Sequence, residues 1–107
     1  MGFKTVNKEL PTITIVLEGK IDATNYADIE NKILEEMKDE AVKTIVFDLN
    51  EVTYISSAGL RMFSGINQEC LRLGKNLIKL INVNEELYKL FKMCGYTSSF
   101  EFEQDEK

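Results

Sequence analysis

The fold is decided by the stretch Asp48-Leu49-Asn50-Glu51-Val52-Thr53-Tyr54-Ile55-Ser56-Ser57-Ala58-Gly59-Leu60-Arg61 and its immediate flanks. Thr44–Leu49 overlaps the start of this stretch and is a nearly continuous run of β-forming residues. Such a run is typical of a central strand buried on both faces. We interpret Asn50 and Glu51 as turn residues. A helical pattern then begins near Ser57 and ends at Gly74, a residue type common just past a helix. One side of this helix carries Gly59, Met62, Phe63, Ile66, Cys70 and Leu73.

The residues before this unit predict a hairpin and a first helix. Thr12–Glu18 alternates between apolar and more polar positions, as a half-buried strand does. Phe3–Asn7 also alternates, so we expect an antiparallel hairpin, with Pro11 at a strand entrance where no ladder donor is lost. A helix follows to about Lys38. Its candidate N-caps are Asp22, Thr24 and Asn25, and its apolar positions are Tyr26, Ile29, Ile33 and Met37.

The residues after Gly74 predict a strand, a helix and an edge strand. The strand covers Leu77–Ile81, and Asn84 caps a helix that ends at Gly95. Phe100 and Phe102 indicate a last strand at the sheet edge. The inward positions of the third helix are Leu87, Leu90, Phe91 and Cys94.

This order of elements predicts one α/β domain over residues 1–107. From Thr44 onward strands and helices alternate, which implies parallel strands joined by right-handed crossovers. The N-terminal hairpin makes the sheet mixed. We therefore expect four or five strands, with three main helices packed mostly on one face. The acidic residues 103–107 are expected to form a frayed tail.

Composition excludes several classes of function. The 107 residues include no histidine, so a Ser-His-Asp unit or a His-ligated metal or haem site cannot be built. The net charge of −5, without a basic block, disfavours nucleic acid as partner. No apolar run suits a signal peptide or membrane insertion, so we expect a cytoplasmic protein. Cys70 and Cys94 are then interpreted as reduced core residues, and no cofactor or metal is expected.

Chemistry is most plausible where Ser57 begins its helix. The first amides of a helix lack partners within it and carry partial positive charge, so an anion on Ser57 would be held by backbone donors. A simpler interpretation is also open. Serine is a favoured N-cap, and Ser-Ala-Gly suits close packing of a helix on a sheet.

Three motifs, in order, resemble the STAS family, the sulfate-transporter and anti-sigma-factor-antagonist domains. The central stretch is similar to the family motif of Asp-Leu, an aromatic-hydrophobic pair, Asp or Ser, Ser, a small residue, Gly and Leu. Gly19–Ala23 is similar to its Gly-x-Leu/Ile-Asp turn. Asn76–Gly95 is similar to its late strand, capped helix and closing glycine. The resemblance covers about Phe3 to Phe102.

The resemblance implies an anti-sigma factor antagonist that is not an enzyme. The unmodified protein would bind an anti-sigma factor with serine kinase activity and so release a sigma factor. Phosphorylation would end the binding, and a serine phosphatase would restore it. Position by position, the acceptor is Ser57, with Ser56 as second choice. The implied partner-binding residues are Asp22, Ala23, Thr24, Ser56, Ser57, Ala58, Gly59, Leu60 and Arg61.

Alternative functions stay open at this point. Family members with this switch commonly carry Asp before the acceptor and Ser or Thr after it, where this chain has Ser56 and Ala58. The chain is alternatively an unphosphorylated interaction module of a signalling scaffold or transport complex. An enzyme with Ser57 as nucleophile would need a base other than His, and no Ser-x-x-Lys pattern follows.

Two further expectations concern small ligands and assembly. The chain lacks the usual phosphate-binding Gly-rich loop that ends in Lys-Ser/Thr, which disfavours nucleotide binding. We expect a monomer or weak dimer. Asp22 suits either an N-cap or a partner contact.

Overall fold

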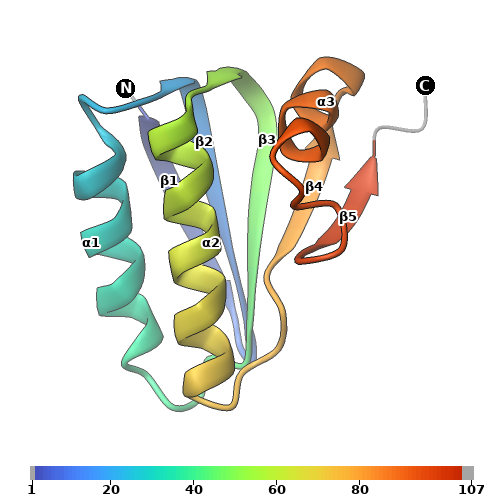
Figure 1. Cartoon of the computed structure of the whole chain (residues 1–107). Helices are drawn as coiled ribbons and strands as arrows, with labels where there is room; N and C mark the ends of the chain where they lie inside the picture. The colour runs from blue at the N-terminus through green and yellow to red at the C-terminus, as the bar shows by residue number, and fades with distance from the viewer. Residues whose placement is uncertain (1, 105–107) are drawn as a thin grey trace.

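Five strands and three helices make up the computed structural model, which describes residues 2–104 (Figure 1). The strands form one sheet in the order β1-β2-β3-β4-β5. β1 is antiparallel to β2, and every later pair is parallel, which confirms the mixed sheet. The elements are β1 (Gly2–Glu9), β2 (Thr12–Ile21), α1 (Tyr26–Met37), β3 (Thr44–Ile55), α2 (Ser57–Arg72), β4 (Lys79–Val83), α3 (Glu85–Met93) and β5 (Glu101–Gln104).

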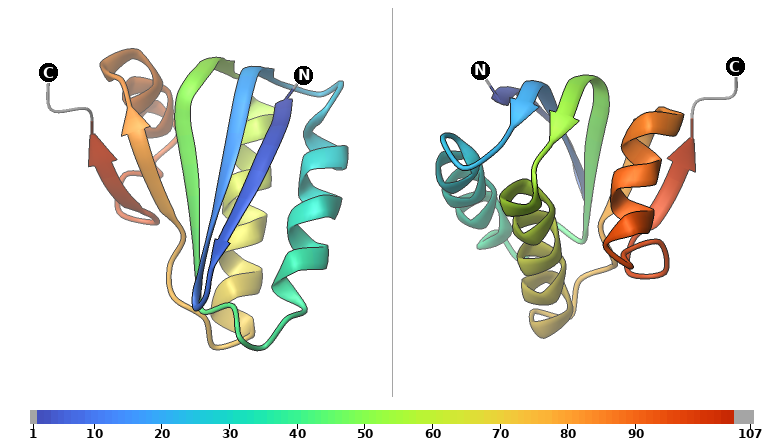
Figure 2. Two further views of the ribbon diagram at one scale, coloured as in Figure 1. Left: turned by 180° about the vertical axis from the view of Figure 1, so that it is seen from behind. Right: turned by 45° about the horizontal axis from the view of Figure 1, so that its top comes forward.

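All three helices cover the same face of the sheet, as Figures 1 and 2 show from opposite sides. The inward side chains of β2 fill the layer between sheet and helices, and Ile13, Ile15 and Leu17 are completely buried there. Aromatic contacts extend this core toward α3. The Phe63 ring lies 5.0 Å from that of Phe47 and 5.8 Å from that of Phe91, so one aromatic cluster joins β3, α2 and α3.

β3 is longer than the sequence predicts, because its pairing with β2 continues past Leu49. Asn50 and Glu51 are strand residues and not a turn, so that interpretation is wrong. β2 still provides pairing partners for this part of β3. Glu18 lies opposite Glu51, after a register shift in which β3 advances by one residue more than β2. Tertiary pairing therefore overrides the local preference of these two polar residues.

α2 and α3 end just before Gly74 and Gly95, as the sequence predicts. Gly74 and Gly95 both have φ of +77°, the left-handed conformation that glycine adopts without penalty just past a helix. The N-terminus of α3 is also as expected, because Asn84 Oδ1 accepts a hydrogen bond of 2.8 Å from the backbone N–H of Leu87.

Three predicted positions near element ends are wrong. Leu73 is 43% exposed and Cys94 is exposed. Each is the C-cap of its helix, where the backbone is no longer helical and the side chain no longer lies on the buried face. Leu77 is 39% exposed and precedes β4, which starts at Lys79. Cys70 is buried as predicted, and burial raises the pKa of its thiol to about 11.

The prediction of a frayed acidic tail over residues 103–107 is wrong for Glu103. Glu103 pairs with Ile81 as part of β5, so its residue belongs to the sheet. Residues 105–107 lie outside the described residues. Among the residues that the structure describes, none of the helices is both long and apolar enough to cross a membrane.

Candidate functional site

The carboxyl ends of β2 and β3 bring two predicted motifs together. Ile21 and Ile55 are register partners at the end of the parallel ladder, and the backbone N–H of Ser56 donates to the Ile21 carbonyl at 2.9 Å. The loop that begins at Asp22 and the start of α2 therefore leave the sheet side by side, at the upper edge in Figure 1 and the right view of Figure 2. Ligands and partners of open α/β sheets commonly bind at such an edge.

The two serines have different places at this edge. Ser56 is the N-cap of α2, is partly buried, and its Oγ accepts a 3.3 Å hydrogen bond from the N–H of Gly59. Ser57 is the first helical residue, is exposed, and its hydroxyl makes no hydrogen bond within residues 2–104. Ser56 thus stabilises the helix end, while Ser57 presents its hydroxyl to solvent.

Gly59 sets how closely α2 approaches the strands. A Cβ at this position would lie 2.9 Å from the carbonyl oxygen of Ile21 and 2.9 Å from Ile55 Cγ2. Gly59 and Leu60 are buried, so they shape the site from below and offer little surface to a partner. Ala58 is half-buried and Arg61 is exposed.

Asp22 organises its own loop and is not the N-cap of α1. Its Oδ1 accepts bonds from the backbone N–H of Thr24 at 3.0 Å and from Thr24 Oγ1 at 2.6 Å. These bonds, the hydroxyl first, lower the pKa of the Asp22 carboxyl from its ordinary 3.8. The N-cap position belongs to Asn25, which makes no side-chain capping bond. Ala23 and Thr24 are exposed on this loop.

One residue at the same edge, Tyr54, is not among the site residues predicted from the sequence. Tyr54 is 46% exposed and lies opposite Lys20 in the ladder, just before the serine pair. The signal in the sequence is faint: Val52 and Ile55 are the buried positions of this segment, so Thr53 and Tyr54 between them face outward. An exposed tyrosine beside a candidate docking loop is an apolar anchor of the kind that interfaces favour.

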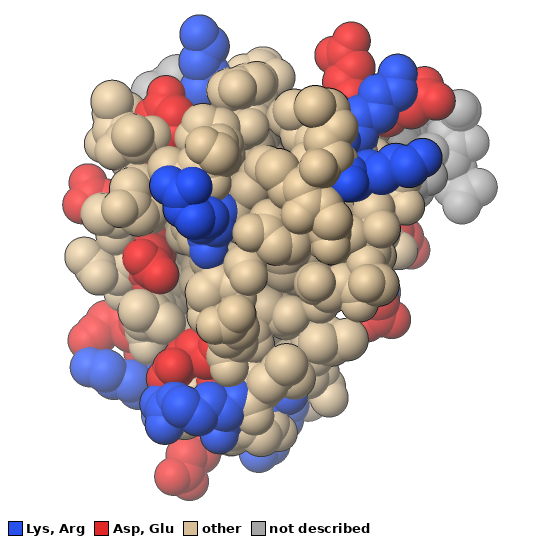
Figure 3. All heavy atoms as spheres, in the orientation of Figure 1, with Lys and Arg blue, Asp and Glu red and all other residues tan. Residues whose placement is uncertain are grey.

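The surface beside this edge is weakly charged. In Figure 3 a basic group lies over the upper half of α2, and the surface between α2 and α3 is largely uncharged. Further Lys and Arg side chains lie at the top of the molecule, beside α3 at the upper right, and toward the lower ends of α1 and α2 in that view.

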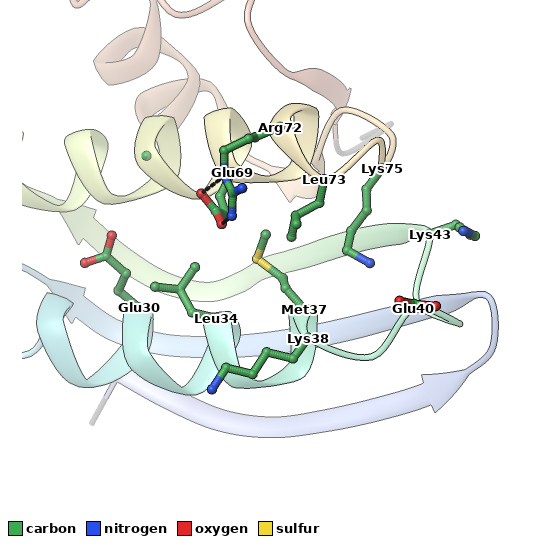
Figure 4. Close-up of a pocket in the computed structure, with 11 residues that line it drawn as sticks. Glu30, Leu34, Met37, Lys38, Glu40, Lys43, Glu69, Arg72, Leu73 and Lys75 are labelled. Carbon is green, nitrogen blue, oxygen red and sulfur yellow. Dashed lines mark hydrogen bonds and ion pairs between the residues drawn. The ribbon is translucent and has the colours of Figure 1, made fainter.

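A cavity of about 820 Å³ lies at that lower end, between α1 and α2, and contains none of the predicted site residues (Figure 4). Its charged side chains are partly engaged with each other, as Arg72 pairs with Glu69. Lys75 is 9% exposed and donates to the carbonyl oxygens of Asp39, at 3.2 Å, and Val42. This lysine joins the loop after α1 to the loop after α2.

The arrangement defines a class of protein: a small mixed α/β domain that presents a serine at the start of its central helix. The model of the STAS domain matches residues 4–107, and the chain belongs to that family. The chain is 30% identical over 95 residues to the anti-sigma-B factor antagonist of Listeria monocytogenes, covering 88% of this chain and 81% of the relative. It is 25% identical over 96 residues to BtrV, a putative anti-sigma factor antagonist of Bordetella bronchiseptica, covering 90% and 81%.

The solved structures agree on the fold. The phosphorylated form of SpoIIAA, a cell fate determinant of Bacillus, superposes with a TM-score of 0.74 at 21% identity, covering 98% of this chain and 92% of that one. At this identity the likeness concerns the architecture alone. It confirms the predicted sheet with its N-terminal hairpin and the one-sided helix layer.

Proposed function

We propose that this chain is an anti-sigma factor antagonist switched by phosphorylation of Ser57. The unmodified form binds an anti-sigma factor that is also a serine kinase, and the sigma factor is released. The kinase transfers the γ-phosphoryl group of ATP to Ser57 Oγ, the hydroxyl loses its proton, and ADP leaves. A serine phosphatase hydrolyses the ester with water and restores the serine. The chain is then a cytoplasmic kinase substrate and not an enzyme.

One observation carries the proposal: Ser57 is exposed at the first position of α2, beside the Asp22 loop. The names of the Listeria and Bordetella relatives support the general role. Ser56 is the weaker acceptor, because its Oγ already caps the helix. Loss of an N-cap bond costs about 1 kcal/mol, so modification there would act on the fold itself.

Electrostatics make a phosphate at Ser57 a sufficient switch. Phosphorylation adds about −1.5 to −2 charge, which the N-terminus of a helix tolerates. Against a partner carboxylate about 5 Å away at an effective dielectric near 20, the repulsion is roughly 5–7 kcal/mol before screening. A thousandfold loss of affinity needs only about 4 kcal/mol. Refolding of the chain is not required.

The docking surface in this proposal joins the loop after β2 to the start of α2. Asp22, Ala23 and Thr24 supply the loop side, and Ser57, Ala58 and Arg61 supply the helix side. Gly59 and Leu60 act by packing, because both are buried. The partially exposed Tyr54 extends this surface along β3.

The experiment starts by purifying the chain with its bound proteins from native cells. The isolated partner is incubated with the chain and ATP, and phosphate is located by mass spectrometry in the unaltered chain, Ser56→Ala and Ser57→Ala. We expect phosphate on Ser57 alone and its loss in Ser57→Ala. We also expect Ser57→Asp to weaken partner binding at least a hundredfold, a loss of about 2.7 kcal/mol. Ser98→Asp adds the same charge at an exposed residue outside the site and serves as the control.

A second candidate function is supported by Ser56 and Ala58, which depart from the residues that commonly flank the acceptor. In that case the chain is an interaction module of a scaffold or transport complex, without a phosphorylation switch. Absence of phosphate from both serines, with unchanged binding by Ser57→Asp, would favour the module and reject the switch.

A further inference from the structure

An arginine close to Ser57 forms no ion pair within the part of the chain that the structure describes. Arg61 is exposed and lies one helical turn after Ser57 on α2. Within residues 2–104 it takes part in no ion pair. The other arginine of the chain, Arg72, lies near the end of the same helix and pairs with Glu69. The two arginines of α2 therefore differ in whether they form an ion pair within the described residues.

The surroundings of Arg61 explain this difference. Its helical neighbours three and four residues away are small and uncharged: Ser57, Ala58, Ser64 and Gly65. From the adjacent helix α1, Glu30 approaches this side of α2, and its Oε2 lies 3.6 Å from the place of a Cβ on Gly65. Glu30 makes no ion pair with Arg61 in the structure. A negative group at position 57 would thus find an available guanidinium.

We propose that Arg61 holds the phosphoryl group of phosphorylated Ser57 in an ion pair on the surface of α2. This inference rests on the proposed function and concerns how the modified state is stabilised. Side chains of a helix lean toward its N-terminus, so Arg61 leans back toward the residue one turn earlier. A guanidinium can donate two parallel hydrogen bonds to phosphate oxygens, which makes such pairs stronger than ordinary surface pairs.

The pair changes what a partner meets at this surface. Arg61 is the one Lys or Arg residue in the first three turns of α2. Figure 3 shows a basic group over this part of the helix, with uncharged surface on the side of α3 and an acidic group on the side of α1. Phosphorylation adds a dianion at Ser57 and, by the same step, engages this cation. A partner that binds the unmodified chain through Arg61 loses a favourable contact and gains a repulsive one.

The first test observes the guanidinium directly. Phosphoserine is placed at position 57 by chemical synthesis and ligation, so that no kinase is needed, and the side-chain Nε–H signals of both arginines are recorded by NMR. We expect the Arg61 signal to shift on phosphorylation and the Arg72 signal to stay in place. An Arg61 signal that is unchanged by the phosphate would overturn the proposal.

The second test is a double-mutant cycle on folding stability. Urea unfolding is compared for Ser57 and phosphoserine-57 chains, each with Arg61 and with Arg61→Gln. We expect the phosphate to favour the folded state about two- to fivefold more with Arg61 than without it. The same cycle with Arg72→Gln is the control and should show no coupling, and Glu30→Gln should leave the coupling intact or enlarge it. Zero coupling for Arg61 contradicts the pair.

The two hypotheses fail in different ways. Because the phosphate is installed without the kinase, an absent Arg61 pair leaves the proposed switch standing. Conversely, if native cells never phosphorylate Ser57, the proposed function is lost whatever the synthetic protein shows.

Discussion

The close approach of α2 to the strand ends requires a residue without a Cβ at position 59. A Cβ on Gly59 would lie 2.9 Å from the Ile21 carbonyl oxygen. We expect Gly59→Ala to lower the free energy of unfolding by about 1–3 kcal/mol, as overpacking does, and to weaken partner binding because the Ser57 end of the helix is displaced. Urea denaturation and partner binding measure the two effects.

Gly65 on the same helix is the matched control for this prediction. A Cβ there would lie 3.6 Å from its nearest neighbour, Glu30 Oε2, which is ordinary contact. Because alanine favours the helix interior over glycine, Gly65→Ala should raise stability by up to about 1 kcal/mol. Equal destabilisation by both substitutions would refute the role given to close approach at Gly59.

The lowered pKa of the Asp22 carboxyl depends mainly on one neighbouring hydroxyl. Thr24 Oγ1 donates to Asp22 Oδ1 at 2.6 Å and is the first cause of the lowered pKa. A carboxyl whose folded pKa is depressed stabilises the fold above its unfolded pKa, and this stabilisation is lost as the pH falls through the folded value. We expect the Asp22 carboxyl to titrate below 3.8 by NMR, and Thr24→Val to move the midpoint upward. A midpoint that Thr24→Val leaves unchanged would assign the shift to the backbone bond.

At the scale of an element, α3 depends on its N-cap. Asn84 Oδ1 satisfies the N–H of Leu87 at 2.8 Å, so Asn84→Ala should cost about 1 kcal/mol of stability. Chemical denaturation provides the measurement. Asn31→Ala is the control, because Asn31 is exposed inside α1 and alanine is the better helix former. A cost at Asn31 as large as that at Asn84 would show that the cap is not the reason.

How far the sequence predicts an element depends on whether its limits are local. The ends of α2 and α3 are local, because Gly74 and Gly95 adopt a backbone conformation that favours glycine, and both were predicted. The end of β3 is not local. Its last residues are held by pairing with β2 across the sheet, and Asn50 and Glu51 alone suggest a turn.

At the scale of the whole molecule, the same distinction separates the parts of the site. The serine pair and its helix could be predicted from one segment, because capping and periodicity act within a few residues. The bond from Ser56 to the Ile21 carbonyl and the outward-facing Tyr54 depend on strand register, which the pattern of a single strand does not define. The structural role of Lys75 could not be predicted for another reason: its acceptors lie on a loop more than 30 residues earlier in the chain.

Lys75 joins two loops at the end of the molecule opposite Ser57. Its substitution should therefore lower the stability of the fold and leave partner binding unchanged. In Lys75→Met the carbonyls of Asp39 and Val42 lose a charged donor, which lowers stability. The substitution also removes a buried charge, which offsets part of that loss. We expect a net loss of about 2–4 kcal/mol in the free energy of unfolding, since bonds to charged groups contribute about 1.5–3 kcal/mol each. Lys43→Met, at an exposed lysine that lines the same cavity, should change stability by less than about 0.5 kcal/mol. Urea unfolding distinguishes the two, and binding of the partner to folded Lys75→Met should equal that of the unaltered chain. Weaker binding by this variant under conditions where it is folded would show that the lower end of the helices also takes part in docking.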